Sequence, residues 1–206
     1  MEEFNQNNST NQYMRMSLSP GKVVCVYDFG TITKVEAETL NFDLNLTKVQ
    51  VFTNNGEIYS WQTSNIYLVG YIMYGIPVSH DGRFVFAQQD MKGMLCLDAK
   101  DGHVVWKTQS RAEYSHVLVG DTHLCCSKSR NEIQLINIEN GSVIQTYRTP
   151  FDNRFEVLTD DIILNHTRSK SWEVLSSKTL DVLQTIPDAF LWQNKRSIEQ
   201  FYKSKT

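Results

Sequence analysis

The sequence predicts an all-β protein built from tandem four-stranded units. Two observations predict this fold class: an internal repeat of 39 residues, and tight-turn dipeptides that separate short apolar runs. A repeat period of about 20 to 50 residues indicates that one small structural unit is stacked along the chain.

The repeat is clearest in three segments that begin 39 residues apart, without a gap. Their sequences are VVWKT, VIQT and VLQT, beginning at Val104, Val143 and Val182. In the same register, residues 84–86 align with 123–125 and 162–164, which predicts one apolar strand in each unit. Met94, Ile133 and Trp172 align in the next strand, and apolar residues follow two positions later, as expected where one face is buried.

The turns between these strands repeat as well. Asp101-Gly102 and Asn140-Gly141 precede equivalent strands, and both dipeptides favour the positive φ angles of hairpin turns. A first strand is predicted near residues 76–79, 116–119 and 155–158. Each regular unit therefore has four short strands.

An irregular unit precedes the regular ones. Its strands are predicted at residues 23–27, 49–53 and 58–61, with Asn55-Gly56 as a hairpin turn. Residues 28–48 are interpreted as an insertion between two strands, and residues 62–75 as a longer passage to the next unit.

Four strands per 39 residues are typical of a propeller blade. Residues 78–108, VSHDGRFVFAQQDMKGMLCLDAKDGHVVWKT, resemble one blade of a WD-repeat or quinoprotein-like β-propeller, and residues 135–147, LINIENGSVIQTY, resemble the end of another. The Trp-Asp pair of WD repeats is replaced by Leu97-Asp98 in the first blade. The AxDxxxGxxxW-like signature of quinoprotein blades survives in part, as Asp98, Gly102 and Trp106. The resemblance implies a small or incomplete β-propeller and does not select the subfamily.

Three regions follow from these patterns. Residues 1–16 are Asn-rich and predict a flexible tail. Residues 17–187 hold the repeats, with the irregular first blade at about 17–75 and the regular repeats at about 76–187. Residues 188–206 predict a short C-terminal helix, because apolar residues recur at helical intervals after Asp188, a possible N-cap.

Composition narrows the expected environment. The 206 residues carry a formal net charge of −3 and no apolar run near the roughly 20 residues that cross a bilayer. We therefore expect no membrane or nucleic-acid partner. The N-terminal residues match neither a secretory signal nor a transit peptide, and the four cysteines form no CxxC pair. These features predict a cytoplasmic protein, with the nucleus as the alternative location.

No pattern for catalysis, a cofactor or a metal is present. The sequence lacks GxSxG and a phosphate-binding Gly loop, and its five histidines are scattered. Cys96 and Cys125 share repeat positions with apolar residues and are expected to be buried, whereas Cys126 is expected nearer the surface. Asp160-Asp161 is interpreted as a turn.

Basic and acidic residues lie mainly in different sets of loops. Loops that join second to third strands, and fourth strands to the next blade, open on one face and carry mainly basic residues: Lys92, Arg111, Lys128, Arg130, Arg148, Arg154, Arg168 and Lys170. The remaining hairpins open on the other face and carry mainly acidic residues: Asp81, Asp98, Asp101, Asp121, Glu139, Asp160, Asp161 and Asp181. The basic face is a candidate site for an acidic or phosphorylated protein partner.

The first functional hypothesis is therefore a non-enzymatic interaction module or scaffold subunit. Two alternatives remain: a degenerate quinoprotein-like enzyme, and an incomplete propeller completed by a partner or by self-association with a second copy. Exposed apolar blade faces would favour such association.

Overall fold

The computed structural model describes residues 13–19, 21–41, 44, 46–64, 76–89, 93–108, 116–129, 131–148, 154–159, 161–167 and 171–187. All regular structure in these segments is β, with sixteen strands in four antiparallel sheets. Within the same segments no helix is long and apolar enough to span a membrane. The predicted C-terminal helix at 188–206 lies outside the described residues.

The three regular units form the second, third and fourth sheets. The second sheet contains β6 (Phe84–Gln89), β7 (Gly93–Asp98) and β8 (Val104–Lys107). The third contains β9 (His116–Val119), β10 (His123–Ser129), β11 (Glu132–Asn137) and β12 (Val143–Arg148). The fourth contains β13 (Arg154–Thr159), β14 (Ile162–Thr167), β15 (Ser171–Ser176) and β16 (Val182–Pro187). Strands adjacent in sequence are adjacent in each sheet, and the third and fourth sheets have the predicted four strands.

In the second sheet the first strand of the unit is reduced to a single bridge. Val78 pairs with Val85, beside the three-stranded ladder of β6, β7 and β8. The predicted strand at 76–79 is therefore present only as this contact. Both valines are buried, so the position still contributes to the core.

The first sheet differs from its prediction. It has five strands: β1 (Tyr13–Ser19), β2 (Lys22–Tyr27), β3 (Ile32–Asn41), β4 (Leu46–Thr53) and β5 (Ile58–Thr63). The supposed insertion at 28–48 contains β3, and residues 13–16 of the supposed tail belong to β1, which pairs with β2. In β3, Val35 and Ala37 are buried while Glu36 and Glu38 alternate with them on the other face, so its period of two is that of a half-buried strand.

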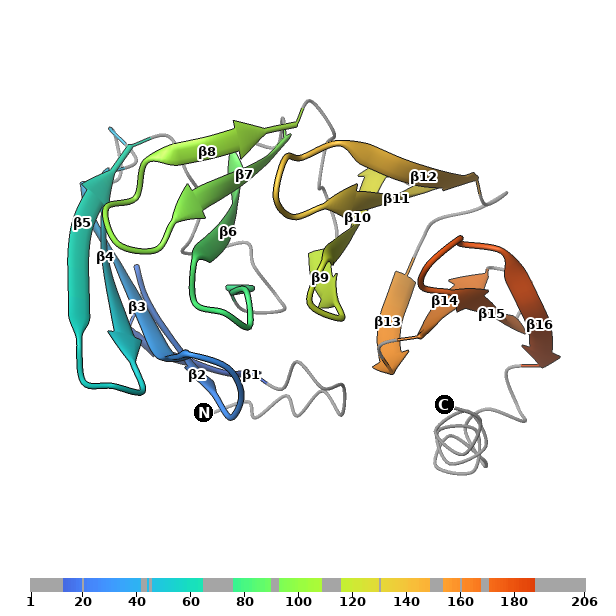
Figure 1. Cartoon of the computed structure of the whole chain (residues 1–206), viewed down its shortest axis with the longest axis horizontal. Helices are drawn as coiled ribbons and strands as arrows, with labels where there is room; N and C mark the ends of the chain where they lie inside the picture. Colours follow the sequence, from blue (N-terminus) through green and yellow to red (C-terminus); the bar gives the residue numbers. More distant parts are fainter. Residues whose placement is uncertain are drawn as a thin grey trace.

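The sheets follow one another in an arc (Figure 1). Three apolar clusters fill the spaces between successive sheets, and each draws residues from two sheets. The first cluster includes both Val35 and Leu97, the second both Phe86 and Leu124, and the third both Cys125 and Ile163. Among the described residues no cluster joins the fourth sheet to the first.

Tryptophans on outermost strands dock two of these junctions. Trp61 of β5 donates its indole N–H to the carbonyl oxygen of Ala99 at 3.1 Å, and Trp106 of β8 donates to that of Ile138 at 2.7 Å. Ala99 and Ile138 are repeat equivalents in the turn of the next sheet. Each indole therefore holds the following blade at the same place.

The docked turns need glycine at the position that faces the indole. A Cβ on Gly102 would lie 2.4 Å from Trp61, and a Cβ on Gly141 would lie 2.7 Å from Trp106. Both glycines have positive φ, +74° and +70°, so the turn conformation also favours glycine. The Gly102 and Trp106 of the quinoprotein-like signature thus act in different junctions.

Candidate partner-binding edge

The antiparallel ladders place two sets of loops at opposite edges of the arc. One edge, here called the basic edge, is where β8, β10 and β12 end and where β11 and β13 begin. The other, here called the acidic edge, carries the turns between β7 and β8, β9 and β10, β11 and β12, and β15 and β16. This is the sorting on which the charge prediction rests.

Two of the eight predicted basic side chains lie in the described part of the chain. Lys128 is 45% exposed and Arg148 is 83% exposed. Both approach Glu132 at the start of β11: Lys128 Nζ donates to Glu132 Oε1 at 2.8 Å, and Arg148 Nε lies 3.9 Å from Glu132 Oε2. The structure therefore brings these two predicted residues together around one carboxylate, and two cations share a single negative charge.

The other predicted basic residues are less fully placed. β13 begins at Arg154, whose backbone pairs with His166, so this position lies at the basic edge. Lys92, Arg111, Arg130, Arg168 and Lys170 lie outside the described residues. Their contribution to the edge stays a prediction.

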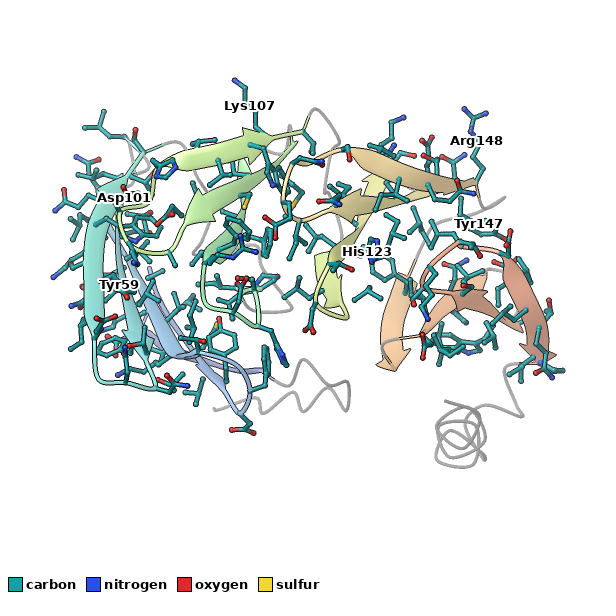
Figure 2. The ribbon with its side chains drawn as sticks, viewed as in Figure 1. Tyr59, Asp101, Lys107, His123, Tyr147 and Arg148 are labelled. Carbon is teal, nitrogen blue, oxygen red and sulfur yellow. The ribbon has the colours of Figure 1, made fainter. Side chains whose placement is uncertain are left out.

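Lys107 is a basic-edge residue that the sequence prediction missed. It is the last residue of β8 and is exposed, and its side chain extends away from the ribbon, as does that of Arg148 at the end of β12 (Figure 2). The prediction counted only loop residues, so a cation on the final residue of a strand was left out. The sequence repeat could have identified Lys107, because it makes β8 and β12 equivalent strands that end at the same edge.

Carboxylates of the acidic edge are paired with cations of the same edge. Arg83 binds the carboxylates of both Asp81 and Glu139, with Arg83 Nη1 donating to Glu139 Oε2 at 3.0 Å. These hydrogen bonds, first to Glu139 and then to Asp81, raise the pKa of Arg83. Lys178 binds Asp161 at 2.8 Å. In the described part of the acidic edge, Arg83 and Lys178 thus neutralise part of the negative charge.

The structure also brings together Asp98, Asp101 and His103, a group that the sequence prediction did not consider as a unit. One ligand atom from each lies within 4.8 Å of the others. The carboxylates already serve the β7–β8 turn: Asp98 Oδ1 accepts from the Lys100 N–H at 2.8 Å, and Asp101 Oδ1 accepts from the His103 N–H at 3.0 Å. We interpret the group as turn-forming residues.

The four cysteines are buried, and none forms a disulfide. This confirms the prediction for Cys96 and Cys125 and corrects it for Cys126, which is fully buried in the cluster between the second and third sheets. Successive residues of β10 point to opposite faces, and a sheet lies against each face, so adjacent thiols are both covered. Burial raises the pKa of Cys126 to about 12 and raises the pKa of Cys96 and Cys125 as well, which makes these thiols poor nucleophiles.

Comparison with known proteins agrees with this architecture. Residues 47–196, more than half of the chain, match the family described as outer membrane protein assembly factor BamB. The chain belongs to the BamB family. With its solved structural neighbours, this places it in the β-propeller superfamily, while the WD-repeat subfamily is not indicated. No curated protein matches the chain.

Solved structures share the fold at low sequence identity. BamB from Moraxella catarrhalis is 18% identical with a TM-score of 0.54, and the alignment covers 77% of this chain and 52% of that one. Hsv2p from Kluyveromyces lactis is 9% identical with a TM-score of 0.56, covering 85% of this chain and 70% of that one. Hsv2 from Kluyveromyces marxianus is 6% identical with a TM-score of 0.55, with coverages of 85% and 68%. The chain thus spans about half the length of that BamB.

Proposed function

We propose that this BamB-family protein is a non-catalytic scaffold subunit that binds a protein partner through its basic edge. The carrying observation is the excess of exposed cations there, with Lys128 and Arg148 sharing Glu132 while Lys107 extends from the neighbouring sheet. An acidic or phosphorylated segment fits this chemistry, because charge-assisted hydrogen bonds to carboxylate or phosphate are the strong ones.

The rest of the fold supports binding rather than catalysis. A repeated core fixes the strands, and the charges that vary between units lie at the strand ends. The family name denotes an assembly factor, which supports a scaffold role by analogy. The proposed partner is therefore a protein rather than a membrane or nucleic acid. The proposed location is a reducing compartment, the cytoplasm or nucleus, which suits four buried cysteines without a disulfide.

Several predicted residues extend the proposed site. Arg154 begins β13 at this edge. The finer proposal adds the residues in the adjoining loops to the same surface: Lys92, Arg111, Arg130, Arg168 and Lys170. Such a row would meet an extended acidic segment along the arc.

Charge reversal at the two edges tests the proposal. The double variant Lys107→Glu/Arg148→Glu changes exposed side chains at the basic edge, and its matched control Asp101→Lys/Asp181→Lys makes the opposite change at the acidic edge. Fluorescently labelled polyglutamate and a phosphoserine peptide serve as probes, and anisotropy measures their affinity as salt is raised. Affinity should fall with salt, because exposed charges are screened over about 8 to 10 Å near physiological ionic strength.

We expect the basic-edge variant to weaken probe binding about tenfold or more, mainly by slowing association. The acidic-edge control should bind as the unmodified protein does or more tightly. Equal losses in both variants, or no loss in the first, would leave the basic edge as ordinary solvated surface. A quinone absorbance band in the purified protein would favour the quinoprotein-like enzyme instead.

A further inference from the structure

A group of polar side chains lies in the junction between the third and fourth sheets. Asn165 of β14 and Glu173 of β15 are directly paired, and Asn165 Nδ2 donates to Glu173 Oε2 at 2.8 Å. Each lies two residues from a member of the apolar cluster of this junction, Ile163 and Leu175, so both point toward the third sheet. Tyr147, near the end of β12 (Figure 2), packs against the same cluster, and its hydroxyl donates to Glu173. We call Tyr147, Asn165 and Glu173 the junction polar group.

The blade itself does not require polar residues at these positions. In the 39-residue repeat, the equivalent pair of the second sheet is Ala87 and Leu95, and both are buried in the apolar cluster that faces the first sheet. The equivalent pair of the third sheet is Cys126 and Gln134, which carries no carboxylate. A carboxamide paired with a carboxylate is therefore a property of this one junction and not of the repeated fold.

The junction polar group contains an acceptor without a donor. Asn165 is 0% exposed, and its Oδ1 has no hydrogen-bond partner among the described residues. Turning the amide round does not solve this, because the amide oxygen would then face the Glu173 carboxylate. A buried acceptor that is left unpaired costs free energy. Its missing partner must be a hydrogen-bond donor.

The carboxylate of Glu173 also lacks a balancing charge. Among the described residues no cation pairs with it, and its partners are the Asn165 amide and the Tyr147 hydroxyl. Arg148 follows Tyr147 in the chain, but it is 83% exposed and approaches Glu132 instead, at 3.9 Å. A partly buried carboxylate beside a free acceptor is complementary to a group that carries both positive charge and N–H donors.

We propose that the junction polar group binds a primary ammonium group. An ammonium carries several N–H donors, which suit the Glu173 carboxylate, the free Asn165 Oδ1 and the remaining lone pair of the Tyr147 hydroxyl. Glu173 and Tyr147 are only partly buried, so the group is accessible from the surface between the two sheets. The full burial of Asn165 favours a compact ammonium over a planar guanidinium.

This site goes beyond the proposed function and does not rest on it. The exposed cations of the basic edge take no part in the junction polar group, so failure of either proposal leaves the other intact. The ammonium belongs either to a small amine or to a lysine side chain of a protein. The chemistry of recognition is the same for both sources, and the experiment separates them.

Small cations test the chemistry on the full-length protein. Titration with n-butylammonium should shift the NMR signal of the Asn165 side-chain amide until it saturates. Tetramethylammonium has the same charge but no N–H donor and should leave this signal unchanged. Glu173→Gln keeps the shape and removes the charge, so it should weaken butylammonium binding about tenfold or more. The matched control Glu132→Gln removes the same charge at the basic edge, outside the group, and should bind as the unmodified protein does.

A pair of peptides identifies the source of the ammonium. One labelled peptide carries a single lysine, and the other carries norleucine at the same place, which keeps most of the side chain without the ammonium. Tighter binding of the lysine peptide, with competition by butylammonium, would assign the site to a lysine of a partner protein. Binding of butylammonium together with equal behaviour of the two peptides would assign it to a free amine.

The apolar pair of the second sheet separates binding from folding. Asn165→Ala/Glu173→Leu introduces the residues that the repeat accepts at positions 87 and 95. We expect it to abolish butylammonium binding while the urea midpoint of unfolding stays the same or rises, because apolar replacement removes the unpaired acceptor. If this double variant does not fold, Glu173→Gln against Glu132→Gln still tests the site.

Three outcomes would overturn the inference. Equal shifts with butylammonium and tetramethylammonium would show an effect of ionic strength alone. The absence of a saturable shift would show that an ordered water satisfies Asn165 Oδ1 and that no ammonium binds there. A lower urea midpoint in Asn165→Ala/Glu173→Leu, with butylammonium binding unchanged, would show that the junction polar group serves only the fold.

Discussion

The junction between the second and third sheets is built differently from that between the third and fourth, although both come from the same repeat. In the former, Trp106 donates to the Ile138 carbonyl at 2.7 Å and covers Gly141. In the latter, the repeat equivalent of Trp106 is the exposed Gln145, and that of Gly141 is the buried Leu180. The two positions change together: where no indole covers the turn, the turn fills the space with its own side chain.

This replacement carries a conformational cost. Leu180 has φ of +57°, close to the +70° of Gly141, and its N–H donates to the Ser176 carbonyl at 2.8 Å as Gly141 does to Asn137 at 2.9 Å. A left-handed conformation costs a non-glycine residue about 1 to 2 kcal/mol, and burying a leucine stabilises by about 1.5 to 3 kcal/mol. The free energy gained by burying Leu180 therefore exceeds the conformational cost only slightly. We expect the third junction to be weaker than the two that tryptophans dock.

The largest expected effect is loss of a docking indole. Trp106→Ala removes a buried ring and its hydrogen bond, so the free energy of unfolding should fall by about 3 to 5 kcal/mol. Gln145→Ala, at the equivalent position of the undocked junction, should change it by less than about 0.5 kcal/mol. Urea unfolding followed by circular dichroism measures both, and similar losses would mean that docking adds nothing beyond the repeat position.

The regular part of this fold could be predicted because each repeat carries its own pattern. Val104, Val143 and Val182 mark the outermost strands, and the structure places β8, β12 and β16 there. The first sheet could not be predicted in the same way. β3 has ten residues and charged side chains on one face, so it matches no strand of the regular unit.

The docking pairs lay beyond sequence reasoning for another reason. Trp61 and Gly102 belong to different sheets, and a repeat alignment compares equivalent positions without showing which ones touch. At the basic edge, charge sorting found Lys128 and Arg148 because hairpin connectivity determines the edge on which a loop opens. It missed Lys107 because it counted loop residues alone, although the repeat places the end of β8 at the same edge as the end of β12.

A smaller effect is expected from adding one methyl group to the docked turn. In Gly102→Ala the positive φ costs about 1 to 2 kcal/mol, and overlap with Trp61 adds about 1 to 3 kcal/mol. Gly56→Ala is the matched control, because Gly56 also has positive φ, +87°, but nothing lies within 4 Å of the added Cβ. In chemical denaturation, Gly56→Ala should lower the free energy of unfolding only by the cost of the positive φ. Equal losses in the two variants would mean that the Trp61 indole moves aside freely.

The smallest expected effect compares the two junctions within one strand. Cys125 and Cys126 are adjacent, but Cys125 lies in the cluster of the undocked junction and Cys126 in that of a docked one. Their raised pKa values and burial keep both thiols unreactive until a junction opens.

Two single-thiol variants, with the other three cysteines replaced by Ala, would each report on one junction through native-state labelling. If opening the undocked junction costs about 1.4 kcal/mol less free energy than opening the junction docked by Trp106, Cys125 should label about tenfold faster than Cys126. After denaturation the two rates should converge, which controls for intrinsic reactivity. Adding Trp106→Ala should then raise the labelling rate of Cys126 and leave that of Cys125 little changed. If Cys126 labels faster than Cys125 without this substitution, the junction filled by Leu180 is the stronger one.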